Sequence, residues 1–202
     1  MFKKLMVFSL ALIGVSVATA QPVFADESKP TVTPMRSDAK TNAGITLTAG
    51  DLLIEEAPNI NFGTAQITAK GDSYPATSVS PWLSVLNAGQ DTNWAVQLKV
   101  GAFSNGTRTL KGASLSLTNT QVTASGGVVS QAPTGADVTI AADGSAKTIL
   151  VADRDKLDTT QYSTLGVGMW FSKFGASLNV PAGNVQGDYK ADLTWTLSNA
   201  PQ

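Results

Sequence analysis

Short runs of alternating apolar and polar residues follow one another along the chain from residue 45 onward, and Gly, Asn, Asp and Pro separate them. The clearest run, NWAVQLKV, places four apolar side chains on one face of a strand: Trp94, Val96, Leu98 and Val100. Shorter runs of the same kind are SLSLT at 114–118, DVTI at 137–140 and VGMWF at 167–171. Side chains alternate across a β-strand with a period of two, and no long window keeps a helical period. The pattern predicts an all-β domain, an antiparallel β-sandwich.

The terminal segment YKADLTWTLSNAP alternates in the same way. Its apolar face carries Tyr189, Ala191, Leu193, Trp195 and Leu197, and its polar face includes Thr194 and Thr196. A face this apolar is typical of a strand that packs on a core, so we predict that Trp195 and Trp94 are core residues. Their two rows could meet from opposing strands and form one cluster. The alternative, that these tryptophans are solvent-facing platforms for a ligand, stays open.

Two further tryptophans are candidates for exposed aromatic residues. In VGMWF, Trp170 is out of phase with Met169 and Phe171, so we predict that it points outward from its strand. Trp82 follows Pro81 and precedes an apolar residue, which leaves its phase ambiguous. β-Sandwiches often hold sugars by stacking them on such side chains. The alternative for each is a half-buried residue that covers the end of a sheet.

The N-terminus has the layout of a secretory signal peptide. Lys3 and Lys4 precede an uncharged apolar stretch over 5–18, and small residues then lead to VFA before Asp26. The apolar stretch is short for a membrane-spanning helix. We predict a signal peptide over 1–25 with cleavage after Ala25, while cleavage after Ala20 and a retained membrane anchor are the alternatives. The prediction implies a secreted protein that is not inserted in the membrane after cleavage.

The rest of the chain divides into a lead-in and one domain. Residues 26–44 are polar, contain two prolines and have almost no large apolar side chains, so we predict a flexible segment. Residues 45–202 are enough for one domain with a core. The C-terminus carries no Leu-Pro-x-Thr-Gly sorting signal and no second hydrophobic segment, so we expect no covalent wall anchor.

Composition narrows the chemistry further. The chain has no cysteine and no histidine. This excludes disulfides, a lipoprotein anchor on cysteine, thiolate nucleophiles, serine–histidine triads and histidine-bound metals. Its 14 Lys and Arg against 15 Asp and Glu give a net charge of −1 and form no basic run. We therefore expect neither nucleic acid nor an anionic lipid surface as a partner. Only a carboxylate pair, as in a glycosidase, could carry catalysis, and we expect no enzyme and no cofactor.

Acidic residues gather in VADRDKLDTTQ, at Asp153, Asp155 and Asp158. Three carboxylates close together raise the question of a calcium site. Their spacing lacks the turn glycine and the terminal glutamate of a helix–loop–helix calcium loop. We predict a solvated loop with alternating charges and no metal site.

Read together, several segments resemble the WxL domain. The family's terminal signature is Tyr-x-x-x-Leu-Thr-Trp-x-Leu with a proline four residues on, and the matching residues are Tyr189, Leu193, Thr194, Trp195, Leu197 and Pro201. DLLIEEAPNINFG is similar to the family's opening, with Pro58, Phe62 and Gly63 in order, and GTRTLKGASLSLTN is similar to its middle part. The resemblance covers about 51–201. The family's first Trp-x-Leu motif departs here, because Trp94-Ala95-Val96 has valine in place of leucine.

This resemblance implies a surface protein of low-GC Gram-positive bacteria that attaches noncovalently to the cell wall, with peptidoglycan as the usual proposed ligand. It also implies a complex with a membrane-anchored WxL-interacting protein and other WxL proteins. Our lead hypothesis is a non-catalytic wall-binding surface module. The alternatives are an assembly subunit that docks on the membrane-anchored partner by sheet edges or loops, an adhesin-like module for a host or glycan ligand, and a secreted glycosidase. Whether the motif residues bind or only pack stays open.

Overall fold

The computed structural model describes residues 41–156 and 164–199. The contacts between residues group the chain into two compact units, residues 1–44 and residues 45–202. In the first unit, residues 41–44 are described, and they are exposed and outside regular secondary structure. The predicted signal peptide, Asp158 and Pro201 lie outside the described residues. All of the strands that the structure describes belong to the second unit.

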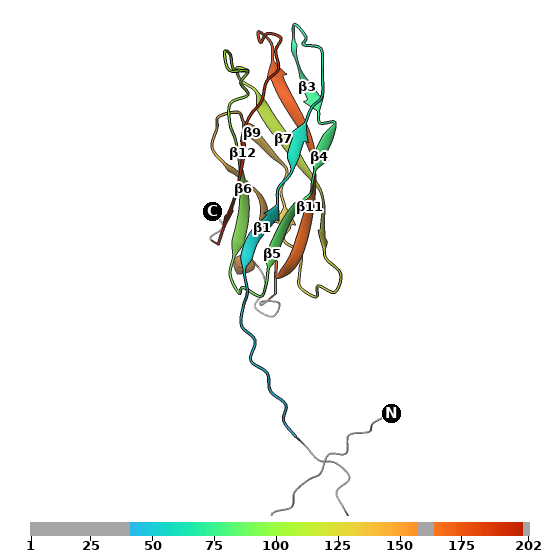
Figure 1. Ribbon diagram of the computed structural model, residues 1–202, viewed down its shortest axis with the longest axis vertical. Coiled ribbons are helices and arrows are strands. Elements are labelled where there is room, and N and C mark those ends of the chain that lie inside the picture. The colour runs from blue at the N-terminus through green and yellow to red at the C-terminus, as the bar shows by residue number, and fades with distance from the viewer. Residues whose placement is uncertain (1–40, 157–163, 200–202) are drawn as a thin grey trace, which may run out of the picture. The chain divides into compact units, whose positions relative to one another are not determined.

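Two antiparallel sheets form the second unit (Figure 1). The larger sheet has six strands in the order β1-β5-β11-β7-β9, with β3 paired to β11. Its strands are β1 (Leu52–Glu56), β3 (Gly71–Pro75), β5 (Leu83–Asn87), β7 (Ser114–Ala124), β9 (Val138–Ala141) and β11 (Gly168–Pro181). The smaller sheet, in the order β12-β6-β10-β8, contains β12 (Leu193–Ser198), β6 (Trp94–Val100), β10 (Lys147–Ala152) and β8 (Thr134–Gly135). A separate ribbon pairs β2 (Asn59–Asn61) with β4 (Ser78–Ser80).

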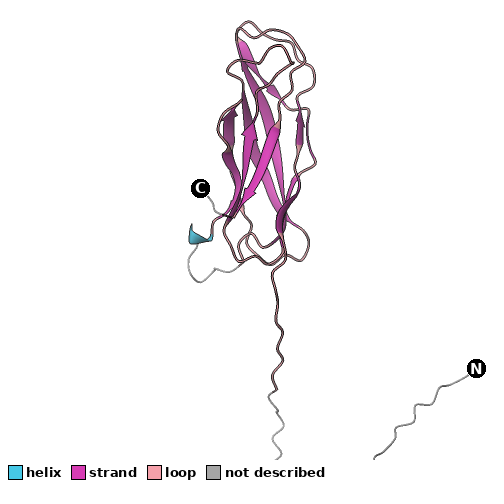
Figure 2. Ribbon diagram, turned by 60° about the vertical axis from the view of Figure 1, so that its left-hand side comes forward, coloured by secondary structure: helices cyan, strands magenta, loops and turns pink. Residues whose placement is uncertain are grey.

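Strands account for nearly all of the regular structure. Within 41–156 and 164–199, the only helical element is the 3-10 turn η1 (Arg154–Lys156), which Figure 2 shows in cyan. No helix in this described part is long and apolar enough to cross a membrane. The fold class predicted from the alternation, an all-β antiparallel sandwich, is confirmed.

The hydrophobic core lies between the two sheets. In β6, the row predicted from NWAVQLKV is 0% exposed: Trp94, Val96, Leu98 and Val100. The larger sheet contributes buried side chains from β5, β7 and β11: Leu83, Val85, Leu115, Leu117, Trp170, Phe174, Leu178 and Val180. Full burial of a Val, Leu or Phe side chain is worth about 1.5–3 kcal/mol relative to its exposure to water. Because the chain has no cysteine, this burial and the ladder hydrogen bonds hold the sheets together.

Trp170 does not point outward, so that prediction is wrong. Its side chain is 4% exposed and lies in the core, next to Val85 of the neighbouring strand β5. β11 runs for 14 residues, and along this length the even-numbered residues from Trp170 to Val180 face the core while Lys173 is exposed. VGMWF covers only the start of this strand, where both faces are apolar. Alternation over so short a window therefore assigned the core side to the wrong residues.

Candidate functional site

Trp94, the first residue of the first motif, is completely buried. Its side chain and that of Val96 are 0% exposed. The indole Nε1–H donates a hydrogen bond to the Gly166 carbonyl oxygen at 3.3 Å. Gly166 has a φ of 69°, and a Cβ there would come within 2.6 Å of the Ala152 Cβ and 2.8 Å of the Trp94 Nε1. Backbone thus covers the indole closely, and this motif packs without offering a surface to a ligand.

The terminal motif lies beside the first motif in the same sheet. β12 pairs with β6 in antiparallel register, with Trp195 opposite Leu98 and Leu197 opposite Val96. The two apolar rows therefore form one packed cluster, as neighbouring strands of the smaller sheet. Regular strand begins at Leu193, later than the alternation from Tyr189 predicted. Tyr189 itself is half-buried and still packs against the core.

Trp195 connects the two sheets at the edge of the sandwich. β12 is the outermost strand of its sheet, and Trp195 is half-buried, packed against the core on its inner face. Its ring centroid lies 6.3 Å from that of Phe174 in β11, with the planes at 42°. Thr194 and Thr196, on the other face, are exposed as the alternation predicted. Trp195 is thus a core-facing residue that keeps part of its surface in solvent.

A groove of about 950 Å³ with a mixed polar and apolar lining brings residues of the two ends of the domain together. Phe62 and Gly63 line it from the segment after β2, and Tyr189 and Leu193 line it from the terminal motif. The Tyr189 hydroxyl donates to the Val185 carbonyl oxygen at 3.0 Å, which fixes the loop that borders the groove. Residues that the family resemblance singled out from distant parts of the sequence therefore meet here.

A second opening of about 590 Å³ lies between β1 and the end of β12. It is lined from β1 by Leu52 and Ile54 and from the terminal strand by Leu197. Both strands are outermost in their own sheets. The 590 and 950 Å³ openings thus both border β12.

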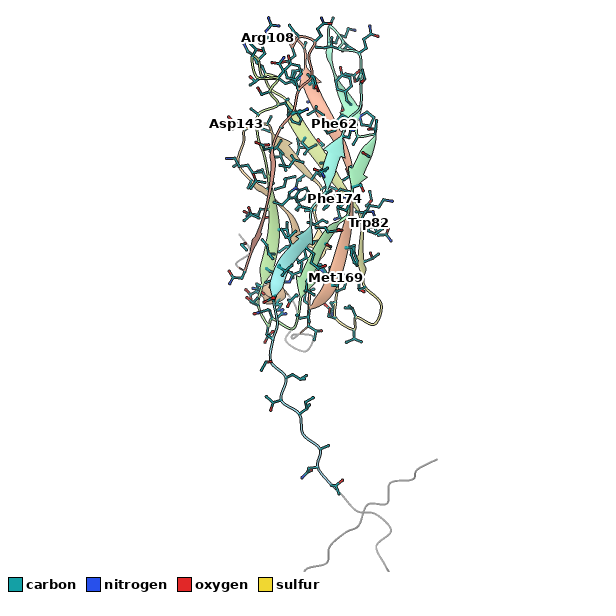
Figure 3. The ribbon with its side chains drawn as sticks, in the orientation of Figure 1. Phe62, Trp82, Arg108, Asp143, Met169 and Phe174 are labelled. Carbon is teal, nitrogen blue, oxygen red and sulfur yellow. The ribbon has the colours of Figure 1, made fainter. Side chains whose placement is uncertain are left out.

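The outer face of the larger sheet carries an apolar patch. We call it the outer patch, and it consists of Leu53, Trp82, Leu86, Met169 and Phe171 with Lys173 at its border. Trp82 is 39% exposed, and the Lys173 Nζ lies 5.5 Å from its ring centroid. Figure 3 shows Trp82 at the margin of the domain and Phe174 nearer its middle.

The register explains how the outer patch forms. Leu86 lies between Leu53 of β1 and Met169 of β11, which makes a row of three apolar residues across three strands. Ser172 pairs with Leu83, so the residues next to them, Lys173 and Trp82, are brought together. Of the two tryptophans that the sequence singled out as candidates for exposure, Trp82 stands at the surface and Trp170 does not. Sequence reasoning missed Met169 and Phe171, and the alternation of the whole strand β11 is the signal that could have found them.

The comparison with protein families settles what these motifs belong to. The family described as WxL domain surface cell wall-binding matches residues 16–201. The chain belongs to this family. A search of curated proteins found no match. The resemblance inferred from the terminal and internal motifs is confirmed, and the protein is a WxL-domain protein of a surface cell wall-binding family.

Arg154 is a buried cation that the sequence pattern did not predict. In this WxL domain its side chain is 8% exposed. The guanidinium donates to the Leu165 carbonyl oxygen at 3.3 and 3.4 Å and to the Gln90 carbonyl oxygen at 3.2 Å, and it forms an ion pair with Asp91. The predicted solvated loop is therefore wrong for this residue. A single arginine among aspartates looks the same in sequence whether it is solvated or inserted beneath two backbone carbonyls.

The neighbouring aspartates of the WxL domain are held by local hydrogen bonds. The Asp155 Oδ2 accepts from the Asn93 Nδ2 at 2.9 Å, and the Asp153 Oδ1 accepts from the Asp155 backbone N–H at 3.2 Å. Among the residues that the structure describes, no three acidic side chains gather into a group that could hold a metal ion.

We expect millimolar calcium to leave the melting temperature of the protein unchanged. A ligand that binds only the folded state raises its stability, so a true site would show itself as a calcium-dependent rise. Thermal melts with and without calcium, with magnesium as the control for ionic strength, measure this. A rise specific to calcium would show that the folded protein has a calcium site.

Proposed function

We propose that the protein is a non-catalytic module that reaches the cell surface through its signal peptide and attaches noncovalently to peptidoglycan through the outer patch. The observation that carries the proposal is Trp82, a 39% exposed indole at the border of an apolar sheet face with the Lys173 ammonium 5.5 Å from its ring. Monomeric soluble domains rarely expose large apolar patches unless these have a function.

The chemistry of the outer patch suits a glycan strand with charged substituents. The C–H face of a pyranose ring is apolar and packs on an aromatic ring, while its hydroxyl rim stays in water. Peptidoglycan offers such rings, and its peptide stems carry carboxylates that a lysine ammonium attracts. Lys173 is held close to Trp82, so a ligand stacked beside the indole would have its anionic groups near a cation.

The first motif is buried and cannot contact the wall, so we assign this contact to the outer patch. Trp94 and Val96 are 0% exposed and would have to leave the core to touch the wall. Trp195 turns its exposed portion toward the edge of the sandwich and shares its inner face with Phe174. The motif residues support the scaffold, and an exposed face of that scaffold is left to make the contact.

Trp82→Ala is expected to weaken binding to washed cell walls about tenfold, the effect of removing one central aromatic contact. Binding isotherms on washed walls measure this, with thermal melts to show that the variant is folded. Thr107→Ala is the control, because it removes an exposed side chain from a loop outside the outer patch, and it should bind like the parent. Parent-like affinity of Trp82→Ala would exclude the outer patch as the contact.

Two further experiments test whether peptidoglycan is the ligand. Lys173→Gln removes the charge and keeps the length of the side chain, so binding should become weaker and less dependent on salt. Walls stripped of their covalently linked polymers by acid should bind as well as whole walls if peptidoglycan is the ligand. Loss of binding on stripping would assign the interaction to another wall polymer.

A second function, assembly into a surface complex, is favoured by the position of β12. This strand carries the family motif on the outermost position of its sheet, where another chain can add a strand. The partners we propose for this function are a membrane-anchored WxL-interacting protein and other WxL proteins. A pull-down with the ectodomain of the membrane-anchored partner, beside one with washed walls, separates the two functions.

A further inference from the structure

An apolar, strand-like segment stands free of the domain just before β1. Residues 45–48 read Ile-Thr-Leu-Thr, and the side chains of Ile45 and Leu47 are 83% and 81% exposed. In Figure 1 the chain before β1 runs beside no strand. The alternation is that of a β-strand with one apolar face, and such a face is normally covered. Within the described part of the chain, nothing covers it.

The segment leaves the domain from a fixed point. The Gly50 backbone N–H donates to the Ala88 carbonyl oxygen at 2.7 Å, and the Gly50 carbonyl oxygen accepts from the Gln90 Nε2 at 2.6 Å. Gln90 is itself held by two hydrogen bonds with the buried Asn87. Residues 45–48 therefore extend from an anchored glycine and present their two apolar side chains to solvent.

The outer edge of β12 lacks the features that usually protect an edge strand. Natural sheets block their edges with charges, prolines or bulges. Residues 193–197 read Leu-Thr-Trp-Thr-Leu, without charge or proline, and they pair with β6 along an unbroken register. The inward-facing side chains Leu193, Trp195 and Leu197 are only half-buried, because no strand lies on their other side in the described residues.

The two segments match each other in pattern and in charge. A strand with the sequence Ile-Thr-Leu-Thr, added to β12, would place Ile45 and Leu47 beside the half-exposed Leu193, Trp195 and Leu197. Its threonines would lie beside Thr194 and Thr196 on the outer face. Apolar–aromatic and threonine–threonine neighbours are favourable cross-strand pairs. Neither segment carries a charge, so the contact desolvates none.

The groove beside β12 supports the same contact. Leu193 lies on its wall, and the exposed apolar side chains Ile67 and Val185, 40% and 45% exposed, line it as well. Leu193 is the residue of β12 that lines it, so an added strand would reach this groove at the Leu193 end of β12.

We propose that residues 45–48 of one copy add to the outer edge of β12 in a second copy, as a fifth strand of the smaller sheet. The contact is a strand addition in which backbone hydrogen bonds provide the affinity and alternate side chains provide the register. The proposal does not depend on the outer patch or on peptidoglycan. Copies can associate even if the protein does not bind the wall, and the protein can bind the wall even if copies do not associate.

Single-cysteine variants test the contact, since the chain has no cysteine of its own. The full chain is purified as Thr46→Cys and, with a different tag, as Thr196→Cys, and the two are mixed under mild oxidation. We expect a mixed disulfide dimer on a non-reducing gel. The control is Thr118→Cys in place of Thr196→Cys, because Thr118 is also exposed but lies on β7 of the other sheet. Equal cross-linking to both positions would overturn the proposal.

The double variant Thr46→Cys/Thr196→Cys distinguishes a second copy from the chain's own segment. Dimers and longer species joined by disulfides are expected. A monomer closed by an internal disulfide at every concentration would show that the segment folds back on its own β12, and the proposal would be wrong. The proposal would also be wrong if position 196 cross-linked to the ectodomain of a membrane-anchored partner and never to another copy.

Analytical ultracentrifugation of the cysteine-free chain gives an independent test. Ile45→Asp/Leu47→Asp is expected to weaken self-association about tenfold or more, since it puts charges on the buried face of the added strand. Val129→Asp is the matched control, because Val129 is 96% exposed outside this contact, and it should associate like the parent, as should Trp82→Ala. A parent that stays monomeric at its highest soluble concentration would contradict the proposal.

Discussion

Replacing Trp94 by alanine is expected to lower the free energy of unfolding by about 3–5 kcal/mol, the cost of removing a large aromatic side chain from a packed core. The side chain is 0% exposed, and β6 lies between β12 and β10 in its sheet, so the surroundings have little freedom to fill the cavity. The Gly166 carbonyl oxygen also loses its hydrogen bond from the indole. Urea unfolding followed by circular dichroism measures the change.

Three companion variants show where this energy comes from. Trp94→Phe keeps most of the ring and leaves the buried carbonyl without its donor, which should cost about 1–3 kcal/mol. Trp195→Ala should cost less than Trp94→Ala, because Trp195 is half-buried on an edge strand. Thr194→Ala, on its exposed face, should stay within about 0.5 kcal/mol of the parent. A Trp94→Ala variant as stable as the parent would refute the assignment of this motif to packing.

The burial of Trp94 affects how wall-binding measurements on variants of this motif are interpreted. Loss of wall binding in a Trp94 variant would follow from loss of the fold, since the indole has no exposed surface. Only variants that melt like the parent can report on contacts with the wall. Trp82 and Lys173, which lie on an outer sheet face, are suited to that purpose.

Replacing Arg154 by methionine is expected to lower the free energy of unfolding by about 2–4 kcal/mol. Methionine keeps much of the apolar volume but cannot donate a hydrogen bond. The buried Leu165 carbonyl oxygen then loses its donor, while the Gln90 carbonyl oxygen loses one donor and keeps the Asn87 Nδ2. A buried acceptor left without a donor costs about 1–3 kcal/mol, and hydrogen bonds from charged groups are the stronger ones. The same urea unfolding measurement gives the value.

Asp91→Asn separates this effect from the ion pair. The Asp91 side chain is 79% exposed, and an ion pair with so exposed a partner contributes at most about 1 kcal/mol. Arg108→Met is the matched control, because Arg108 is an exposed arginine in a surface loop (Figure 3) and its loss should change stability little. If Asp91→Asn proved as costly as Arg154→Met, the ion pair and not the carbonyl contacts would hold η1 in place.

Strands in which only one face is apolar could be predicted from the amino-acid pattern alone. NWAVQLKV and the terminal LTWTL each alternate between apolar and polar side chains. Because alternate side chains lie on opposite faces of a strand, only one face of each strand is apolar and can pack on the core. The inward orientation of Trp94, Trp195 and Leu98, the exposure of Thr194 and Thr196, and the sandwich class all follow from this. The terminal signature likewise led to the family, because six matching positions within 13 residues are specific.

Features that depend on contacts between distant residues could not be predicted from the local pattern. Met169 and Phe171 are as apolar as Trp170, so the sides of β11 are distinguished by the strand's pairing with β5 and by what covers each face. The register that places β12 beside β6 joins residues about 100 positions apart. The burial of Arg154 depends on carbonyl groups from two other segments, and a local charge pattern contains no information about such distant acceptors.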